Sequence, residues 1–170
     1  MRNFGLAGNV FGWQNPLATG KKIGSFNLLV PGCSIYETAA QALPTNGAET
    51  AVTFSFEYFD HGELHSTTTN TSRITFVVPG VYFFLGRFFW DANATGTFRE
   101  ARILLNGNNA IDDQALVPSS VFSLSQQTSA LYRVSAGDYA ELTAQHDGGA
   151  GRSVASPVSP ARFSALWVSS

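Results

Sequence analysis

The stretch RITFVVPGVYFFLGRFFW, residues 73–90, decides the fold of this chain. In its first part, one face would carry Ile74, Phe76 and Val78, and the opposite face Arg73, Thr75 and Val77. This period of two predicts a β-strand with one buried face. Pro79-Gly80 then interrupts the run and predicts a turn. We therefore expect a strand, a turn and a second strand that together form a central hairpin.

The second part of the stretch, residues 81–90, is apolar on both faces of the predicted strand. One face carries Tyr82, Phe84, Phe88 and Trp90, and the other carries Val81, Phe83, Leu85 and Phe89. Arg87 alone interrupts the second face, whereas a strand that faces solvent is polar on one side. We expect both faces to be covered, one by the core of a sandwich and one by a second partner, for which another copy of the chain is a candidate. Which face is the subunit contact is left open.

Composition bounds the number of domains and the class of partner. The chain has 170 residues, 44% of them hydrophobic, which suits one domain with a short extension. Charged residues make up only 13%, against roughly 25% in an ordinary globular protein, so we expect part of the surface to be covered. The net charge of -2 and the lack of a basic face argue against nucleic acid. No apolar run approaches the roughly 20 residues of a membrane span, so we expect no membrane insertion.

Residues 1–36 differ from the rest and are predicted to form an extended N-terminal arm. They contain no acidic residue and carry a formal charge of +3, whereas the domain of residues 37–170 carries -5. Frequent glycines break helix and strand periodicity, yet the spaced aromatic residues are unlike a flexible linker. We expect the arm to dock on another surface, and packing on its own domain is the open alternative. The candidate contact residues are Phe4, Phe11, Trp13, Lys21, Lys22 and Phe26.

The rest of the chain is typical of an all-β domain. Short alternating or apolar runs, bounded by turn signals such as Asn106-Gly107, predict strand after strand, and no convincing amphipathic helix interrupts them. Outside the opening stretch, the predicted strands are 34–43, 50–59, 97–106, 109–116, 121–125, 130–134, 139–145 and 161–168; the first also suits a short helix. A Gln-rich turn is expected between the two short strands 121–125 and 130–134. About eight to ten strands at this spacing predict a sandwich or jelly roll.

Three segments resemble one known family, and they occur in the right order. PGVYFF at residues 79–84 is similar to the central strand of the complement globular-head and tumour-necrosis-factor-like jelly rolls. SAGDYAEL at residues 135–142 resembles their turn before a late strand, and RFSALWV at residues 162–168 resembles their closing strand. The resemblance covers about residues 40–170 and implies a two-sheet jelly-roll sandwich (TNF-like) that assembles as a compact homotrimer.

A further run narrows the resemblance to bacteriophage virion proteins. It consists of ANATG at residues 92–96, Arg99, and RILLNG at residues 102–107, and it is similar to jelly-roll domains in those proteins. Together with the doubly apolar strand, the resemblance places the large aromatic residues of the central and closing strands in the trimer interface or core. These residues are Tyr82, Phe83, Phe84, Phe88, Phe89, Trp90, Phe163 and Trp167.

The resemblance also implies a role in a virus particle. We expect a non-enzymatic capsid decoration (cement) protein on the outer surface of the virion, made in the host cytoplasm, whose arm binds the major capsid protein. The alternative is a tail or fibre-tip module that binds a host-surface glycan or receptor through the loops 60–72 and 146–159. A carbohydrate-active enzyme is a third hypothesis, and the lack of an acid pair in a defined cleft argues against it.

No constellation of residues predicts a catalytic site, a bound cofactor or a metal site. DHGELH at residues 60–65 contains side chains that Zn²⁺ accepts, but a polar loop, solvated or at the trimer surface, explains it without a metal. Asp112-Asp113 could ligate Ca²⁺, although two adjacent surface carboxylates are the simpler interpretation. The sequence has no Gly-x-Ser-x-Gly elbow and no phosphate-binding loop. Cys33 is the single cysteine, so an internal disulfide is excluded.

Overall fold

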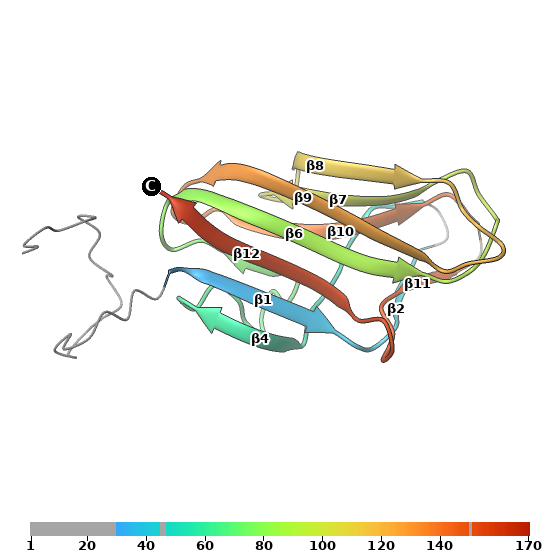
Figure 1. Cartoon of the computed structure of the whole chain (residues 1–170), viewed down its shortest axis with the longest axis horizontal. Helices are drawn as coiled ribbons and strands as arrows, with labels where there is room; N and C mark the ends of the chain where they lie inside the picture. The colour runs from blue at the N-terminus through green and yellow to red at the C-terminus, as the bar shows by residue number, and fades with distance from the viewer. Residues whose placement is uncertain (1–29, 45–46, 150) are drawn as a thin grey trace, which may run out of the picture.

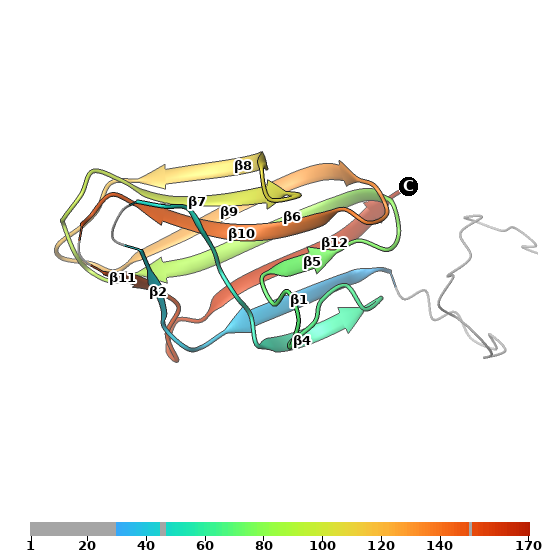
Figure 2. The same cartoon turned by 180° about the vertical axis from the view of Figure 1, so that it is seen from behind.

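The structure is a computed structural model that describes residues 30–44, 47–149 and 151–170. These residues form an all-β sandwich in which every long element is a strand (Figures 1 and 2). The strands are β1 Gly32–Glu37, β2 Gln41–Leu43, β3 Thr50–Ala51, β4 Phe56–His61, β5 Arg73–Thr75, β6 Gly80–Trp90, β7 Arg99–Leu105, β8 Asn109–Leu116, β9 Leu124–Val134, β10 Tyr139–His146, β11 Arg152–Val154 and β12 Ala161–Ser169. A search of the described residues found no helix long and apolar enough to cross a membrane.

Two antiparallel sheets face each other across the core. The front sheet, nearest the viewer in Figure 1, has seven strands with β6 at its centre. β9 pairs with one edge of β6, and β12, β1 and β4 follow in order from the other edge, while β11 pairs with the end of β6 and carries β2. The back sheet, nearest the viewer in Figure 2, consists of β3, β10, β7 and β8, with β5 also paired to β10. This arrangement confirms the predicted two-sheet jelly roll.

The core lies between the sheets and is filled by the inward face of β6. The side chains predicted to share that face are buried, namely Tyr82, Phe84, Phe88 and Trp90. Phe76 packs against Tyr82 and Phe84 with ring centroids 4.7 and 5.6 Å apart. Phe163 of β12 stacks on Phe84 at 6.5 Å, so the closing strand lies in the middle of the front sheet. Buried ring pairs of this kind contribute beyond the area that they remove from water.

The predicted hairpin of residues 73–90 is wrong, because its two strands lie in different sheets. β5 joins the back sheet through β10, whereas β6 lies in the front sheet, so Pro79-Gly80 carries the chain from one sheet to the other. Gly80 has a φ of 151°, and a β-carbon there would lie 2.4 Å from Trp167 Nε1. The crossing therefore needs glycine both for its backbone conformation and for the close approach of the indole.

Residues 50–59 form two short strands in different sheets rather than the single predicted strand. β3 pairs with β10 in the back sheet, and β4 pairs with β1 in the front sheet. Between them the Glu37 carboxylate accepts hydrogen bonds from the backbone N–H and the hydroxyl of Ser55, which holds the crossing chain against β1. In a single strand 50–59, alternation would put these four apolar side chains on one face, but Val52 and Phe54 are buried, whereas Phe56 and Tyr58 are exposed.

The predicted Gln-rich turn is wrong as well, because residues 124–134 form one continuous strand, β9. Gln126 lies in its first half and is fully buried. Its side chain accepts a hydrogen bond from Trp90 Nε1 at 2.7 Å and donates to the carbonyls of Arg99 and Gln114. A buried amide is stable where its donors and acceptor are all satisfied. Gln126 therefore joins β6, β7 and β8 at one point instead of turning the chain.

The first strand begins inside the segment that was assigned to the arm. β1 starts at Gly32 and is paired on both sides, with β12 and with β4, and Cys33 and Ile35 are fully buried. Residues 32–36 thus belong to the front sheet, and the arm cannot extend to residue 36. The predicted strand 34–43 is divided into β1 and β2, and the Glu37 carboxylate accepts bonds from two backbone N–H groups at this break.

A buried arginine holds together one end of the sandwich, where the loop 91–98 meets residues 147–149. The Arg99 guanidinium is inaccessible to solvent and donates to the carbonyls of Phe98, Asn93 and Thr95 at 2.9, 3.3 and 2.9 Å. The Arg152 guanidinium donates to the Thr95 hydroxyl. The Arg99 that follows the ANATG run is therefore an internal brace of its own loop.

Next to this brace, His146 gives the domain a dependence on pH. His146 Nδ1 accepts a hydrogen bond from Gly148 N at 3.1 Å, which requires an unprotonated nitrogen. Burial, and then the charges of Arg99 and Arg152, lower the pKa of His146. Below about pH 6.5, His146 is therefore protonated in the unfolded chain but remains neutral in the folded chain. Folding stability consequently falls as the pH falls.

We expect the urea midpoint of unfolding to decrease from about pH 7.5 to about pH 5.5, with a contribution from His146 of at most about 1.4 kcal/mol per pH unit. His146→Gln keeps an acceptor for Gly148 N but cannot be protonated, so it should flatten this profile. His61→Gln, at an exposed histidine, is the matched control and should leave the profile unchanged. A His146→Gln profile as steep as that of the unsubstituted chain would contradict the assignment.

Candidate subunit interface

The outward face of the front sheet is apolar across its central strands. The strand register places Phe83 of β6 opposite Leu166 of β12 and Leu131 of β9. These three side chains are 43%, 47% and 63% exposed, respectively, and Leu85 and Phe89 on the same face of β6 are half-buried. A contiguous exposed apolar patch of this kind marks an interaction surface.

Aromatic rings extend this face onto β1 and β4. Tyr36 lies next to the inward-facing Ile35 and opposite Arg162 of β12, so it belongs to the outward face. Its ring stacks against those of Phe56 and Tyr58, with centroids 5.2 and 4.3 Å apart. Phe56 and Tyr58 each leave about half of their surface exposed. β1 and β4 therefore add a second apolar area to the front face, and Arg162 and the hydrogen-bonded Ser34–Ser164 pair lie between it and Phe83, Leu131 and Leu166.

The outward face of the back sheet is different, because it carries more charged side chains and its arginines Arg73 and Arg102 are paired within the chain. Arg102 of β7 bonds to Glu100 and Glu49 at 2.9 and 3.4 Å, and Arg73 of β5 bonds to Glu141 of β10 at 3.2 Å. Such a polar face is typical of an antiparallel sheet in contact with solvent. The front sheet is consequently the layer that needs a cover on its outer side.

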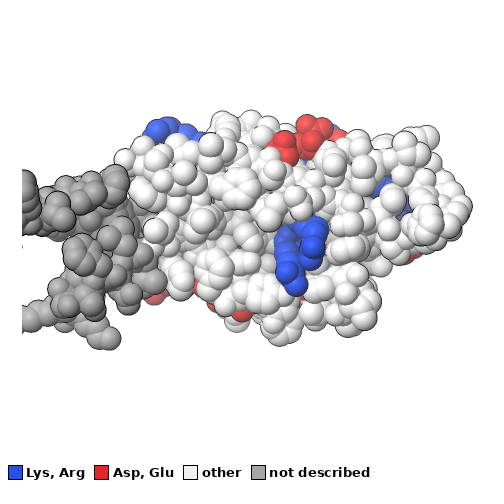
Figure 3. All heavy atoms as spheres, viewed as in Figure 1, with Lys and Arg blue, Asp and Glu red and all other residues white. Residues whose placement is uncertain are grey.

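Two arginines lie side by side at the centre of the front face. Arg87 of β6 and Arg162 of β12 are directly opposite each other in the strand pairing. Figure 3 shows one basic group over these two strands, surrounded by uncharged side chains. Each guanidinium lies near an aromatic ring: the Arg87 Cζ is 5.4 Å from the Phe89 centroid, and the Arg162 Cζ is 5.0 Å from the Tyr58 centroid.

Solved structures share this architecture at low sequence identity. The globular domain of zebrafish complement 1qA protein matches with a TM-score of 0.61 and 17% identity, covering 81% of this chain and 97% of that chain. Murine APRIL, in a crystal structure at pH 5.0, matches with a TM-score of 0.62 and 8% identity, covering 82% and 99%. The chain has the C1q and tumour-necrosis-factor jelly-roll fold. No family model and no curated protein sequence matches the chain.

The jelly roll divides the predicted interface-or-core residues between the two faces of its front sheet. Tyr82, Phe84, Phe88, Trp90 and Phe163 fill the core, Phe83 and Phe89 lie on the outward face, and Trp167 is half-buried over Gly80. Of these two neighbours, Phe84 therefore lies in the core and Phe83 on the outward face. The candidate arm residues Phe4, Phe11, Trp13, Lys21, Lys22 and Phe26 lie outside the residues that the structure describes.

Sequence reasoning missed Tyr36, Phe56, Tyr58 and Leu131 as members of this face. Phe56 and Tyr58 alternate with two buried residues, so the sequence pattern assigned them to the core. Tyr36 fell at the end of the predicted arm, and Leu131 fell in the short predicted strand 130–134, to which no buried or outward face was assigned. The one local signal for Phe56 and Tyr58 is that three aromatic residues crowd into four positions, 56–59, which is more than one face of a strand can bury.

The predicted polar loop 60–72 is packed at its start rather than solvated. Asp60 accepts hydrogen bonds from two backbone N–H groups of the loop at 3.0 Å. The His65 side chain is buried, and its two ring nitrogens lie 2.8 Å from Glu57 Oε1 and 3.2 Å from the Thr71 carbonyl oxygen. Both nitrogens thus have protein partners, and no group of three or more His, Cys, Asp or Glu side chains among the described residues could hold a metal ion.

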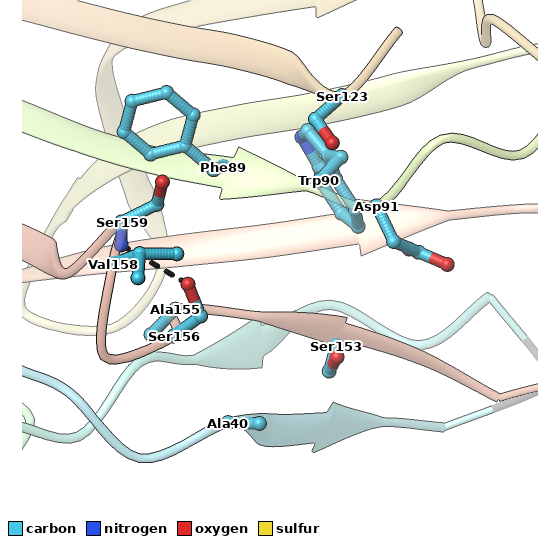
Figure 4. Close-up of a pocket in the computed structure, with 10 residues that line it drawn as sticks. All are labelled: Ala40, Phe89, Trp90, Asp91, Ser123, Ser153, Ala155, Ser156, Val158 and Ser159. Atoms are coloured by element: carbon cyan, nitrogen blue, oxygen red, sulfur yellow. Dashed lines mark hydrogen bonds between the residues drawn. The ribbon is translucent and has the colours of Figure 1, made fainter. Parts of the chain in front are cut away.

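A hollow of about 270 Å³ lies where the end of β6 meets the connection from β11 to β12 (Figure 4). Phe89 and Trp90 contribute its aromatic walls, and Ser159 N donates to Ser156 Oγ at its rim at 3.0 Å. Asp91 is the one ionisable residue among those that line it, and its carboxylate points away from the other side chains. Glycoside hydrolysis uses two carboxyl groups across a bond, so this hollow offers a contact surface rather than an acid–base pair.

Proposed function

We propose that the chain is a non-enzymatic structural protein that assembles as a homotrimer and decorates a bacteriophage capsid, to which its N-terminal arm binds. The observation that carries the proposal is the apolar outward face of the front sheet, which a single chain leaves uncovered. The jelly-roll fold and the resemblance of residues 92–107 to virion proteins support it.

Self-association is the simplest cover for this face. Each Å² of apolar surface removed from water stabilises the assembly by about 25 cal/mol, and Phe83, Leu131 and Leu166 contribute to one continuous area. Identical chains assemble by closed rotational symmetry, and a face that is covered by a different surface of the next copy generates a ring. The number three comes from the resemblance to the homotrimeric jelly rolls rather than from the residues of the face.

The position of β1 gives the arm a common point of departure. Gly32, the first residue of β1, pairs with Leu166 near the end of β12, so the described domain begins and ends at the same end of the sandwich (Figure 1). Three arms would therefore leave a rotational assembly from one end. Residues 1–29 carry three basic and no acidic side chains, which suits an acidic partner surface. Three linked arms gain roughly 10²–10⁴-fold in avidity.

A tail or fibre-tip module that binds a host receptor is the second candidate, and one observation favours it. Val117, Val121 and Phe122, in the connection from β8 to β9, are 79%, 70% and 70% exposed. This connection lies at the end of the sandwich opposite the start of β1 (Figure 1). Exposed apolar loop tips at the far end suit contact with a protein or glycan on a host surface.

Deletion of residues 1–29 tests the decoration role. The deletion keeps all of β1, so we expect a folded trimer by sedimentation velocity that no longer co-sediments with capsids of the source phage. The full-length chain, sedimented with the same capsids, is the control. Capsid binding at full strength by the shortened chain would reject the arm, and a well-folded full-length monomer at micromolar concentration would reject the assembly. Full-length protein that does not bind capsids but binds host cells would favour the receptor-binding module.

A further inference from the structure

The Arg87–Arg162 pair has no counter-charge among the residues that the structure describes. The two residues are direct cross-strand neighbours on the front face, where like charges repel. Among the described residues, neither guanidinium forms an ion pair or a hydrogen bond. The acidic residues on the strands of the front sheet bond elsewhere: Glu37 to Ser55, Glu57 to His65, and Asp60 to the backbone of its own loop. The pair therefore has no anionic partner among the described residues of its own chain, and another molecule can supply one.

The edge of the sandwich formed by β8 and β9 carries the opposite charge. Asp112 Oδ2 accepts hydrogen bonds from the Thr128 hydroxyl and, at 2.8 Å, from Ser129 N, which fixes this carboxylate beside β9. Asp113 is exposed and makes no hydrogen bond within the described chain. Its cross-strand neighbour Arg102 already holds two other carboxylates. The edge thus has an excess of negative charge.

The acidic edge and the basic pair lie at nearly the same level along the strands. In the register of β6 with β9, Gln127 is opposite Arg87, and Ser129, which holds Asp112, is opposite Leu85. The two levels differ by two residues of a strand, or roughly 7 Å. Figure 3 shows the acidic group over β8 and the basic group over β6 and β12 at matching positions along the long axis of the molecule.

A rotation about an axis parallel to the strands keeps every residue at its level. Such a rotation brings the β8–β9 edge of one copy onto the front face of the next. We propose that Asp112 and Asp113 on this edge pair with Arg87 and Arg162 of the neighbouring copy, and that this cluster specifies the contact between subunits. The proposal rests on the homotrimer proposed above and states the chemistry of its interface, which is an acidic edge on a basic, apolar face.

The proposed ion pairs and the apolar residues around them contribute differently to the interface. Phe83, Leu131 and Leu166 supply area that any apolar surface could cover. Arg87 and Arg162 accept only a surface that carries anions at their own level, because a buried charge without a partner is strongly unfavourable. The ion pairs therefore select which edge docks and at which height, as charge complementarity does at other interfaces.

Charge reversal with rescue tests this pairing in the full-length chain. The face-reversed variant carries Arg87→Gln and Arg162→Glu, the edge-reversed variant carries Asp112→Asn and Asp113→Lys, and the swapped variant carries all four substitutions, so that one ion pair remains with its charges exchanged. We expect each single-side reversal to raise the concentration of half-assembly by about 100-fold or more, and the swapped variant to return to within about tenfold of the unsubstituted chain. The measurement is sedimentation equilibrium, and a thermal melt verifies the fold of each variant.

Glu63→Lys changes the charge by the same amount as Asp113→Lys but lies in an exposed loop, so it should assemble normally. If loss of the Asp112 carboxylate prevents folding, Asp113→Lys alone serves as the edge variant, because Asp113 makes no hydrogen bond within the described chain.

A swapped variant that assembles no better than the face-reversed variant overturns the pairing but leaves the proposed trimer intact. Normal assembly of the edge variant, combined with tightening by inorganic phosphate, overturns it in favour of a free anion. A monomeric unsubstituted chain overturns the underlying assembly itself.

Discussion

Removal of residues 161–170 is expected to abolish folding of the domain. This segment contains β12, which lies between β1 and β6 in the middle of the front sheet. Its inward side chains are buried, and Phe163 stacks on both Phe54 and Phe84. Without β12, the front sheet separates into a β1–β4 pair and a second group of β6, β9, β11 and β2, and the two groups share no pairing.

The expected loss exceeds the stability of an ordinary domain. The Phe163 side chain alone is worth about 3–5 kcal/mol if it is removed from a packed core. β12 also pairs six residues with β1 and seven with β6, and each lost hydrogen bond adds about 0.5–1.5 kcal/mol. Net stabilities of domains are about 5–15 kcal/mol. The shortened chain should consequently be unfolded or insoluble.

Circular dichroism and the dispersion of amide resonances would measure this loss, together with the soluble yield. Removal of Ser170 alone is the control, because this residue only accepts one long hydrogen bond, of 3.4 Å, from Arg133. That deletion should change the free energy of unfolding by less than about 0.5 kcal/mol. A shortened chain without residues 161–170 that melts cooperatively near the temperature of the full chain would show that β12 is dispensable.

Alternation along single strands was predictable from the sequence, because it is a local property. The inward face of β6, with its four large aromatic residues, follows from residues 80–90 alone. The same holds for the closing strand and for the tight turn at Asn106-Gly107, where both residues have positive φ values of 54° and 77°. In each case the residues next to one another in the sequence are sufficient to predict the local structure.

The assignment of strands to sheets was not predictable in the same way. β5 and β6 were interpreted as a hairpin, and β3 and β4 as one strand, yet each pair is split between the two sheets. An alternating run shows which side chains of a strand are buried. It does not show which sheet contains the strand, because both sheets of a sandwich bury their inner faces in the same core. The crossings are set by contacts far apart in sequence, such as that of Glu37 with Ser55 and of Gly80 with Trp167.

The middle of β9 was misread for a related reason. Gln126 and Gln127 are polar, so the local pattern predicts a turn at this point. The partners that satisfy the buried Gln126 come from β6, β7 and β8, and no window of the sequence contains them together. Buried polar side chains are generally invisible to pattern reasoning, because their stability depends on partners supplied by the tertiary fold.

The candidate interface was predictable in kind but not in full. The doubly apolar strand correctly indicated one face in the core and left a second face to be covered. One signal for the direction of that second face was present in Arg87, which shares a face with Phe83; charged side chains are rarely buried in a core, so this face had to be the outward one. The contribution of β4 was not predictable, because it depends on the crossing at residues 52–55.

Phe84→Ala and Phe83→Ala are expected to have separate effects, although the residues are adjacent in one strand. Phe84 is fully buried and lies 5.6 Å from the Phe76 ring and 6.5 Å from the Phe163 ring. Its truncation leaves a cavity in the core and should cost about 3–5 kcal/mol in the free energy of unfolding. Phe83 is 43% exposed, so its truncation should cost the isolated subunit less than about 1 kcal/mol.

The effect on assembly should have the opposite order, because Phe83 lies on the outward face between Leu166 and Leu131. Phe83→Asp places a carboxylate opposite Leu166 and Leu131, where a covered interface has no room for its hydration, and it should yield a folded monomer. Urea unfolding below the concentration of half-assembly measures the stability of the subunit free of the contribution from association. Sedimentation equilibrium at higher concentration measures the assembly. If Phe83→Asp assembles as the unsubstituted chain does, the outward face of the front sheet is not the contact between subunits.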